Sequence, residues 1–277
     1  MGRDELKNLL ITIRENNYSI PEGKYPYELS IEMMNNLGDL DPELRDDLIL
    51  SNLSNWIVEG VLSKEEVKRL LFIALDEQHL FKGIGDRDDT VFCRTFSVLV
   101  VALAVYRHRT DAFLTESELK ETLHKVLTFY QEDKDVRGYI DEKGWAHGAA
   151  HGADALDELA RCTEIMEDDL WMILEVIHHK VNIVGYGYIH FEEERMITAV
   201  KAVLERKMIV QEQLISWIRS FQTIEKTGAD QENLVMEFNV QTFLKSLYFR
   251  LVDYPEYEII AAEVKGVLMQ INRFYNI

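Results

Sequence analysis

Proline is scarce in this chain and occurs only at Pro21, Pro26, Pro42 and Pro255. More than two hundred consecutive residues therefore contain none. Because proline removes a backbone N–H donor and clashes with the preceding turn of a helix, this long span favours helices. No stretch alternates clearly between apolar and polar residues over a strand's length, and the least helical stretch, 181–189, is predicted to be a loop. The sequence therefore predicts an all-α protein.

Cysteine, long apolar runs and basic residues are scarce as well. Cys93 and Cys162 lack a CxxC spacing, which predicts two buried, reduced thiols rather than a disulfide framework or a zinc knuckle. The longest apolar stretch, 96–106, is too short to span about 30 Å of hydrocarbon and is predicted to be a buried helix. The 30 basic and 49 acidic residues give a net charge of −19, which opposes binding to nucleic acids and anionic membranes. We expect a cytoplasmic protein.

Common catalytic motifs are missing too. The chain contains no GxSxG, no P-loop and no GxGxxG, and no serine has the flanking glycines of a nucleophile elbow. Common hydrolase, kinase and dinucleotide-binding interpretations therefore lose their main support.

The chain does contain a series of helix signals. Capping boxes begin at Ser63 and Thr115, and Asp41-Pro42 has the residue types that open a helix. Between such signals the apolar residues recur with a period near 3.6, as expected for amphipathic helices. The predicted helices are 3–16, 26–37, 42–59, 64–81, 89–108, 116–134, 144–161, 167–180, 190–207, 209–225, 239–253 and 256–275.

The predicted helices come in pairs. Polar openings recur every 46 to 56 residues, at Asp41, Asp88, Gly144, His190 and Asn239. This spacing is close to the roughly 40–47 residues of HEAT and armadillo repeats. We predict a single helical-repeat domain over 1–277, an α/α superhelix or HEAT/armadillo-like solenoid of about six helix pairs, with an irregular bundle as the alternative. The inner helix of each pair should line a groove, where a binding site is expected.

The segment 144–158 is the most unusual in the chain. It contains three glycines inside a predicted helix, where each costs about 1 kcal/mol relative to alanine. Close approach of a neighbouring backbone or a ligand at Gly148 and Gly152 would account for this cost. At 100° per residue, one face of the predicted helix carries four polar side chains: His147, His151, Asp154 and Glu158.

Three interpretations of this polar face remain open. It lines a polar binding groove, or it holds a divalent metal ion through His147, His151 and Asp154, or it is the solvated side of an amphipathic helix. A two-histidine, one-carboxylate site would leave a position for a water that attacks a substrate, although the glutamate of HExxH is missing. Without metal, nearby carboxylates should raise the pKa values of both imidazoles, whereas a metal would depress them.

Five further residues complete the candidate groove: Trp145, Arg94, Glu194, Lys245 and Tyr248. Arg94 has the chemistry of an anion clamp, but pairing with a neighbouring carboxylate is favoured. Glu193 or Glu194 would face the two histidines across the groove, although acidic residues in a first turn are favoured by the helix dipole alone. Lys245 suits capture of a carboxylate or phosphate, or neutralisation of buried acids.

Several segments resemble a bacterial domain-of-unknown-function family, number 2785. The segments are Asp41-Pro-Glu-Leu-Arg-Asp-Asp-Leu, Asp89-Thr-Val-Phe-Cys-Arg-Thr-Phe-Ser, Arg137-Gly-Tyr, Lys143-Gly-Trp-Ala-His-Gly-Ala-Ala-His-Gly-Ala-Asp, Glu192-Glu-Glu-Arg and Phe243-Leu-Lys-Ser-Leu-Tyr-Phe-Arg-Leu. They span nearly the whole chain. The resemblance implies an all-helical, cytosolic bacterial protein, most familiar from Gram-positive bacteria, and it implies no activity.

The leading functional prediction is a non-enzymatic helical-repeat protein that binds a protein, a peptide or a small polar ligand in a groove lined by the inner helices. The alternative is a metal-dependent hydrolase that uses His147, His151 and Asp154. Neither nucleic acid nor membrane is an expected partner.

Overall fold

A computed structural model describes residues 1–223 and 230–274 and confirms the prediction of an all-α protein. The described residues form twelve α-helices, a π-helix, a 3-10 helix and a two-stranded hairpin. In chain order these are α1 (Arg3–Glu15), α2 (Pro26–Asn35), η1 (Glu43–Leu50), α3 (Ser51–Val58), α4 (Lys64–Ala74), α5 (Thr90–Thr110), α6 (Glu116–Glu132), β1 (Tyr139–Ile140), β2 (Gly144–Trp145), α7 (Gly148–Ala160), α8 (Glu167–Val181), α9 (Glu192–Arg206), α10 (Gln211–Ser220), α11 (Asp230–Leu251), η2 (Pro255–Tyr257) and α12 (Glu258–Ile271).

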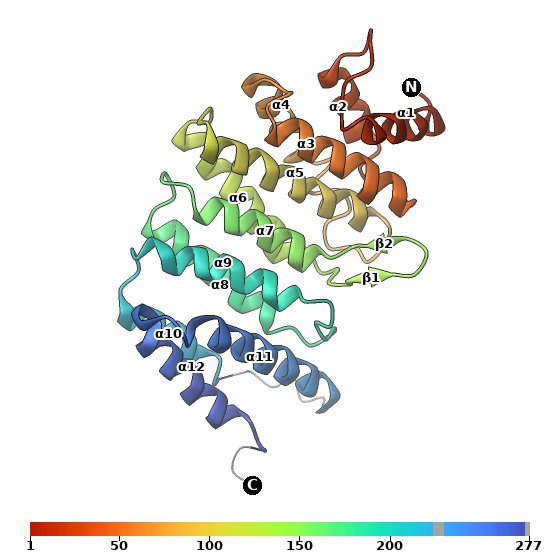
Figure 1. Cartoon of the computed structure of the whole chain (residues 1–277). Helices are drawn as coiled ribbons and strands as arrows, with labels where there is room; N and C mark the ends of the chain where they lie inside the picture. Colours follow the sequence, from red (N-terminus) through yellow and green to blue (C-terminus); the bar gives the residue numbers. More distant parts are fainter. Residues whose placement is uncertain (224–229, 275–277) are drawn as a thin grey trace.

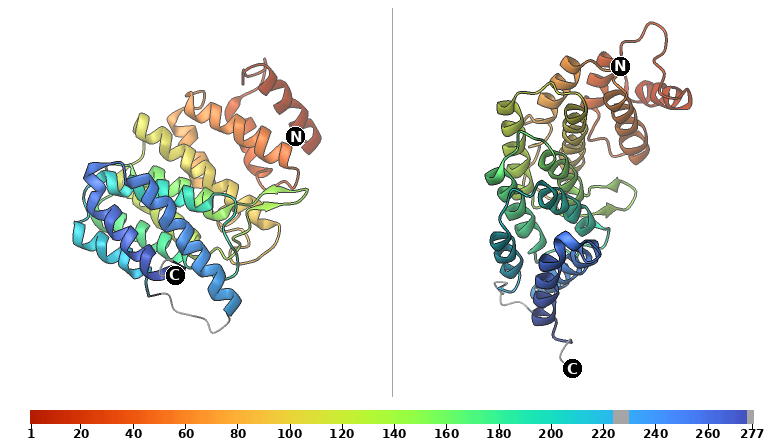
Figure 2. Two further views of the ribbon diagram at one scale, coloured as in Figure 1. Left: turned by 60° about the horizontal axis from the view of Figure 1, so that its bottom comes forward. Right: turned by 60° about the vertical axis from the view of Figure 1, so that its left-hand side comes forward.

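The helices stack along one axis, with the two chain ends at opposite ends of an elongated body (Figures 1 and 2). Helices α3, α5, α7, α9 and α11 form one row, in which each contacts the next. Helix α4 packs on α5, α6 on α7, α8 on α9 and α12 on α11. One continuous apolar cluster, from Leu6 to Leu268, lies between these elements.

Helix α5 crosses the middle of the row. Among the described helices, α5 alone is both long enough and apolar enough to cross a membrane, judged by length and composition only. Most of its residues are nevertheless buried inside the protein, which confirms the prediction of a buried helix for 96–106. Helices α3 and α4 cover it on one side and α7 on the other.

Local signals in the sequence predicted several helix starts correctly. Both predicted capping boxes form: the side chains of Ser63 and Thr115 accept hydrogen bonds from the N–H groups of Glu66 and Glu118. In return, the carboxylates of Glu66 and Glu118 accept hydrogen bonds from the N–H groups of Ser63 and Thr115. The loop predicted for 181–189 is also present between α8 and α9.

Four predicted helix boundaries were wrong. The helix predicted for 64–81 ends at Ala74, and that predicted for 239–253 begins at Asp230. The helix predicted for 209–225 ends at Ser220, and that predicted for 256–275 ends at Ile271. The last residues of these two predictions, 224–225 and 275, lie outside the described part of the chain.

The segment 144–147 also differs from its prediction, because it is not helical. Gly144 and Trp145 pair with Ile140 and Tyr139 in a short antiparallel hairpin. The N–H of His147 donates to the carbonyl of Arg137 at 2.9 Å, and His147 has a left-handed backbone with φ of 51°. Since these backbone groups bond to the hairpin rather than to a helix, α7 begins only at Gly148.

The glycines of α7 lie where neighbouring elements approach closely, as the sequence predicted. A Cβ on Gly148 would lie 3.1 Å from Oδ2 of Asp133, and one on Gly152 would lie 2.4 Å from Cδ2 of Tyr130. Helix α7 makes the most extensive helix–helix contacts of the described structure, with α5 and α9. The two glycines therefore allow α7 to lie deep between its neighbours.

We predict opposite effects for the same substitution at two helical glycines. Gly152→Ala should lower the free energy of unfolding by about 1–3 kcal/mol, because the added methyl overlaps the Tyr130 ring. Gly266→Ala in α12 is the matched control. Nothing lies within 4 Å of the Cβ position of Gly266, so this substitution should raise the free energy of unfolding by about 0.5–1 kcal/mol. Urea denaturation of both variants measures the difference, and a Gly152→Ala protein as stable as the parent would contradict close packing at α7.

Candidate functional site

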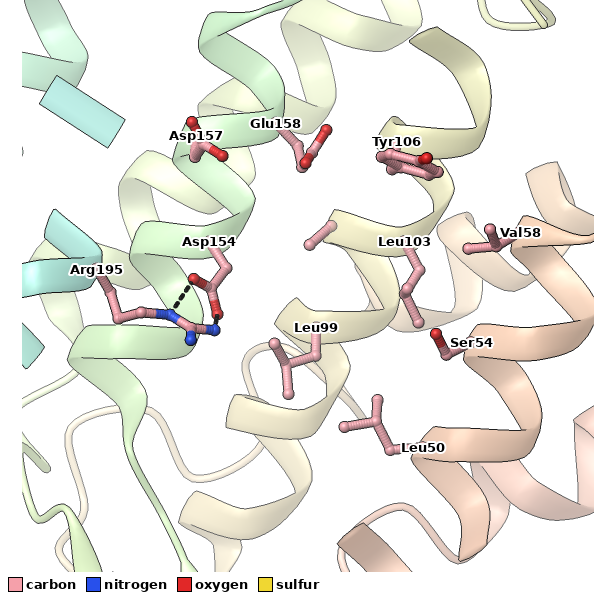
Figure 3. A pocket seen from close by; sticks show the side chains of 11 residues that line it. Leu50, Ser54, Val58, Leu99, Leu103, Tyr106, Asp154, Asp157, Glu158 and Arg195 are labelled. Atoms are coloured by element: carbon pink, nitrogen blue, oxygen red, sulfur yellow. Dashed lines mark hydrogen bonds and ion pairs between the residues drawn. The ribbon is translucent and has the colours of Figure 1, made fainter. Parts of the chain in front are cut away.

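A groove of about 440 Å³ lies between α3, α5, α7 and α9 (Figure 3). We call it the α7 groove. Its lining residues are Leu50, Ser54, Val58, Leu99, Ala102, Leu103, Tyr106, Asp154, Asp157, Glu158 and Arg195. Asp154 and Glu158, two of the four residues predicted to share a polar face, therefore do line a groove.

The floor of the α7 groove is apolar and partly open to solvent. Leu99, Leu103 and Tyr106 of α5 follow one another at helical spacing and point toward the groove, with Tyr106 39% exposed. Leu50 and Val58 face them from η1 and α3 (Figure 3). This strip interrupts the otherwise buried surface of α5.

The opposite wall of the groove is acidic. Asp154, Asp157 and Glu158 occupy positions i, i+3 and i+4 of α7, so they share one face of the helix. Burial raises the pKa of each of these carboxyls, although a neighbouring arginine opposes the shift in every case. The groove itself is lined by three carboxyl groups and one guanidinium, that of Arg195.

Each carboxylate of the wall has an arginine partner. Arg195 binds Asp154 through two hydrogen bonds, Nε to Oδ1 at 2.6 Å and Nη2 to Oδ2 at 2.5 Å (Figure 3). Arg161 binds Asp157 one turn away on the same helix. Arg109, from the end of α5, binds Glu158. These pairs hold the acidic side chains in place along the groove.

A second cluster of polar and aromatic side chains lies at the start of α7 and α9. Trp145 stacks on His147 with ring centroids 4.8 Å apart, and it contacts His190 edge-on at 5.4 Å. His147 Nε2 hydrogen-bonds the carbonyl of His190 at 3.1 Å. Oε1 of Glu192 lies 3.7 Å from the same nitrogen and has no hydrogen-bond partner among the described residues. We call these four residues the histidine cluster.

The backbone at the histidine cluster is strained. His147 and Phe191, the N-cap residues of α7 and α9, both have left-handed backbone conformations, with φ of 51° and 65°. Such conformations cost non-glycine residues about 1–3 kcal/mol and persist where surrounding contacts hold them. The hydrogen bond between the His147 ring and the His190 carbonyl holds the two strained N-termini together.

Of the two predicted histidines, His151 is buried and His147 is half-buried. His151 lies under the groove against Phe96, with ring centroids 5.3 Å apart, and its Nδ1 has no partner in the described structure. Burial lowers the pKa of His147 to about 4 and that of His151 to about 3. The expectation that nearby carboxylates would raise these pKa values in the absence of metal was wrong, because desolvation outweighs every nearby carboxylate.

His147, His151 and Asp154 do not come together as metal ligands, so that prediction was wrong in its geometry. The Asp154 carboxylate is held by Arg195, and Nε2 of His147 by the His190 carbonyl. Within residues 1–223 and 230–274, no group of three or more His, Cys, Asp or Glu side chains is arranged to hold a metal ion. The rings of His147 and His151 do contact each other edge-on, with centroids 5.5 Å apart, but the Asp154 carboxylate is bound by Arg195.

The other predicted groove residues lie elsewhere. Arg94 is fully buried and pairs with Asp133 at 3.0 Å, which agrees with the structural pairing favoured for it. Glu194 pairs with Arg250 of α11 at 3.2 Å. Lys245 is exposed on α11, and Tyr248 is half-buried against the core. None of the four is among the residues that line the α7 groove.

The sequence analysis missed the apolar lining of the groove and four charged or histidine side chains of the two sites: Asp157, Arg195, His190 and Glu192. Asp157 lies between Asp154 and Glu158 on the same face of α7. The rotation of 100° per residue that selected those two residues could therefore also have identified Asp157. Glu192, rather than Glu193 or Glu194, is the carboxylate near His147. Nothing in the order of residues 190–195 marks which of these three side chains turns inward.

The chain matches the family model described as "Protein of unknown function (DUF2785)" over residues 80–249. This match covers more than half of the chain, so the protein belongs to that family, and the family resemblance is confirmed. The matched range includes the α7 groove walls from α5, α7 and α9 and the whole histidine cluster, but not η1 and α3. No curated protein and no solved structure shows a significant match.

We predict that the buried histidines destabilise the protein in mild acid. Their folded pKa values, about 4 and about 3, lie below the unfolded value near 6.5. The unfolded chain therefore binds more protons below pH 6.5, and stability present above that pH declines as the pH falls toward the folded pKa values. Each histidine should remove about 1.4 kcal/mol of unfolding free energy per pH unit in this window.

Urea denaturation at several pH values between 7 and 5 measures this slope. His151→Gln should flatten it, whereas His124→Gln, at an exposed position of α6, should leave it unchanged. Equal slopes for the parent and both variants would show that His151 is not a buried neutral group.

Proposed function

We propose that this member of the DUF2785 family is a binding module whose α7 groove holds a segment of a protein or peptide that combines apolar and basic side chains. We further propose that its stacked helix pairs form a single HEAT/armadillo-like α/α solenoid of about six pairs over 1–277. The observation that carries the functional proposal is the exposed apolar strip of α5 beside the acidic wall of α7.

The apolar strip supports a docking role. Apolar side chains gathered in a concave, solvent-accessible site are typical of surfaces that bind a partner. The apolar side chains of the groove come from η1, α3 and α5, and all face the same groove: Leu50, Val58, Leu99, Leu103 and Tyr106. A partner's apolar side chain would be removed from water here without rearrangement of the core.

The acidic character of the chain supports a basic partner. Arginines pair with the three carboxylates of the wall, but the chain as a whole carries a net charge of −19. A Lys or Arg next to an apolar anchor would meet Asp154, Asp157 and Glu158 at the edge of the strip. Long-range attraction between the acidic chain and a basic segment would also speed their encounter.

Two other predictions fit the groove less well. A small polar ligand would leave the apolar floor uncovered. A hydrolase built on His147, His151 and Asp154 would need these groups to converge on one substrate, and their side chains are instead engaged with or buried against different neighbours. A cytoplasmic location, with no nucleic acid or membrane partner, remains a prediction from the net charge.

Fluorescence anisotropy with a labelled peptide tests the proposal. The probe is an end-capped peptide of about ten residues in which Leu and Phe alternate with Lys and Arg, and its twin carries Glu in place of each basic residue. We expect the basic peptide to bind, with an affinity that falls as salt is added. Binding of the acidic twin with equal affinity would overturn the charge argument.

Variants locate the binding. Leu99→Gln combined with Leu103→Gln should weaken binding of the basic peptide by about thirtyfold, since roughly 1 kcal/mol of apolar burial is lost at each of the two half-buried positions. Phe249→Gln on α11 is the control, because Phe249 is 72% exposed and lies outside the groove. If the double variant binds as well as the parent and the control, the peptide does not occupy the α7 groove.

A further inference from the structure

A second pocket, of about 420 Å³, lies where α6 and α8 end and shares no lining residue with the α7 groove. We call it the Lys180 pocket. Its walls include the apolar side chains of Val136, Val176 and Ile183, together with Tyr130 and Asp133. The inference drawn from it is independent of the proposed function.

Lys180 is an unusual lysine. It is only 7% exposed, and its Nζ donates one hydrogen bond, to the backbone carbonyl of Asp133 at 3.0 Å. Nζ also lies 4.9 Å from the centroid of the Tyr130 ring. Nζ therefore lies beside Tyr130 and Asp133, which line the pocket together with Lys180. The backbone of Lys180 is fixed as well, because the Tyr188 hydroxyl donates to its carbonyl at 2.8 Å.

No carboxylate in the described structure forms an ion pair with Lys180. Asp133, which also lines the pocket, pairs its carboxylate with Arg94 at 3.0 Å. A buried ammonium without such a partner is poorly solvated, and burial lowers the pKa of Lys180 to about 8. At pH 7.5 about a quarter of the molecules would carry a free amine, against roughly one in a thousand for an exposed lysine.

The pocket suits a small reactant with an apolar body. Helices α6 and α8 both end there, at Glu132 and Val181, and helix C-termini carry partial negative charge. The carbonyl that accepts the hydrogen bond from Lys180 belongs to the residue that follows α6. Lys134 and His179 also line the pocket, so its charge does not decide the reactant. Its three aliphatic side chains suit the apolar body of a small aldehyde or ketone.

We propose that Lys180 is a nucleophile that forms an imine with a small, apolar aldehyde or ketone bound in this pocket. The free amine adds to the carbonyl carbon, the proton lost by nitrogen is returned to oxygen, and one water leaves as the C=N bond forms. Carbonyl compound and amine thus give imine and water, and no oxidant or reductant takes part.

Reductive trapping on the intact protein tests this proposal. Butanal and sodium cyanoborohydride are added at pH 7.5 for short times, and each lysine is then quantified by peptide mass spectrometry. We expect Lys180 to be alkylated at least tenfold faster than Lys134, an exposed lysine on the rim of the same pocket. In urea, where the pocket is lost, the two lysines should react at equal rates.

The pH dependence separates a nucleophile from a lysine that only caps α6. For a nucleophile, the alkylation rate of Lys180 should rise with a midpoint near pH 8. A ketone of similar size, such as 3-methylbutan-2-one, should compete with butanal. A lysine that only caps the helix would be protected, with labelling slower than that of Lys134 at every pH. Slower or equal labelling of Lys180 in the folded protein would overturn the proposal, whatever the outcome of the peptide-binding experiment.

Discussion

The close packing of α7 between α5 and α9 is the constraint on which both candidate sites depend. A Cβ at Gly152 would lie 2.4 Å from the Tyr130 ring, which no Cβ permits, and one at Gly148 would be crowded by Asp133 and Thr95 at 3.1 and 3.2 Å. Helix α7 therefore lies deep in the row, with its acidic face next to the exposed strip of α5. The same approach brings the N-termini of α7 and α9 together, where the Trp145 and His147 rings stack beside His190.

Buried cations hold the connections around this packed centre. The guanidinium of Arg45 is fully buried: it donates to the carbonyls of Asp39 and Lys143 and lies 4.2 Å from the Phe92 ring centroid. It thus ties the hairpin to the N-terminal helices and to α5. Arg206 of α9 donates to the carbonyls of Ala160 and Cys162 and so satisfies the C-terminal end of α7. In each case an arginine binds backbone carbonyls that the helices leave without a partner.

The sequence predicts best what is determined locally. The capping boxes at Ser63 and Thr115 form as expected because every atom involved lies within four residues. The start of α7 was misplaced because it depends on the pairing of 139–140 with 144–145 and on the left-handed backbone of His147. The helix propensities of residues 144–147 do not reveal this pairing. Alanine and tryptophan at these positions are compatible with a helix.

The same distinction applies to the sites. Helical geometry placed Asp154 and Glu158 on one face correctly, but their arginine partners come from other elements and could not be inferred. The sequence did not predict the partly exposed strip of α5 either, but for a different reason. That helix is apolar on every side, so its sequence does not show that Leu99, Leu103 and Tyr106 are the side left uncovered.

Methyl NMR of the protein with labelled Leu and Val side chains tests the central claim most directly, that the α7 groove is the ligand site. On addition of the basic, apolar peptide, the account predicts shifts of the Leu50, Val58, Leu99 and Leu103 methyl signals, which line the groove. Methyls of the distant, buried Leu6 and Val264 should stay in place. Shifts confined to methyls outside the groove, or none at saturating peptide, would contradict the account.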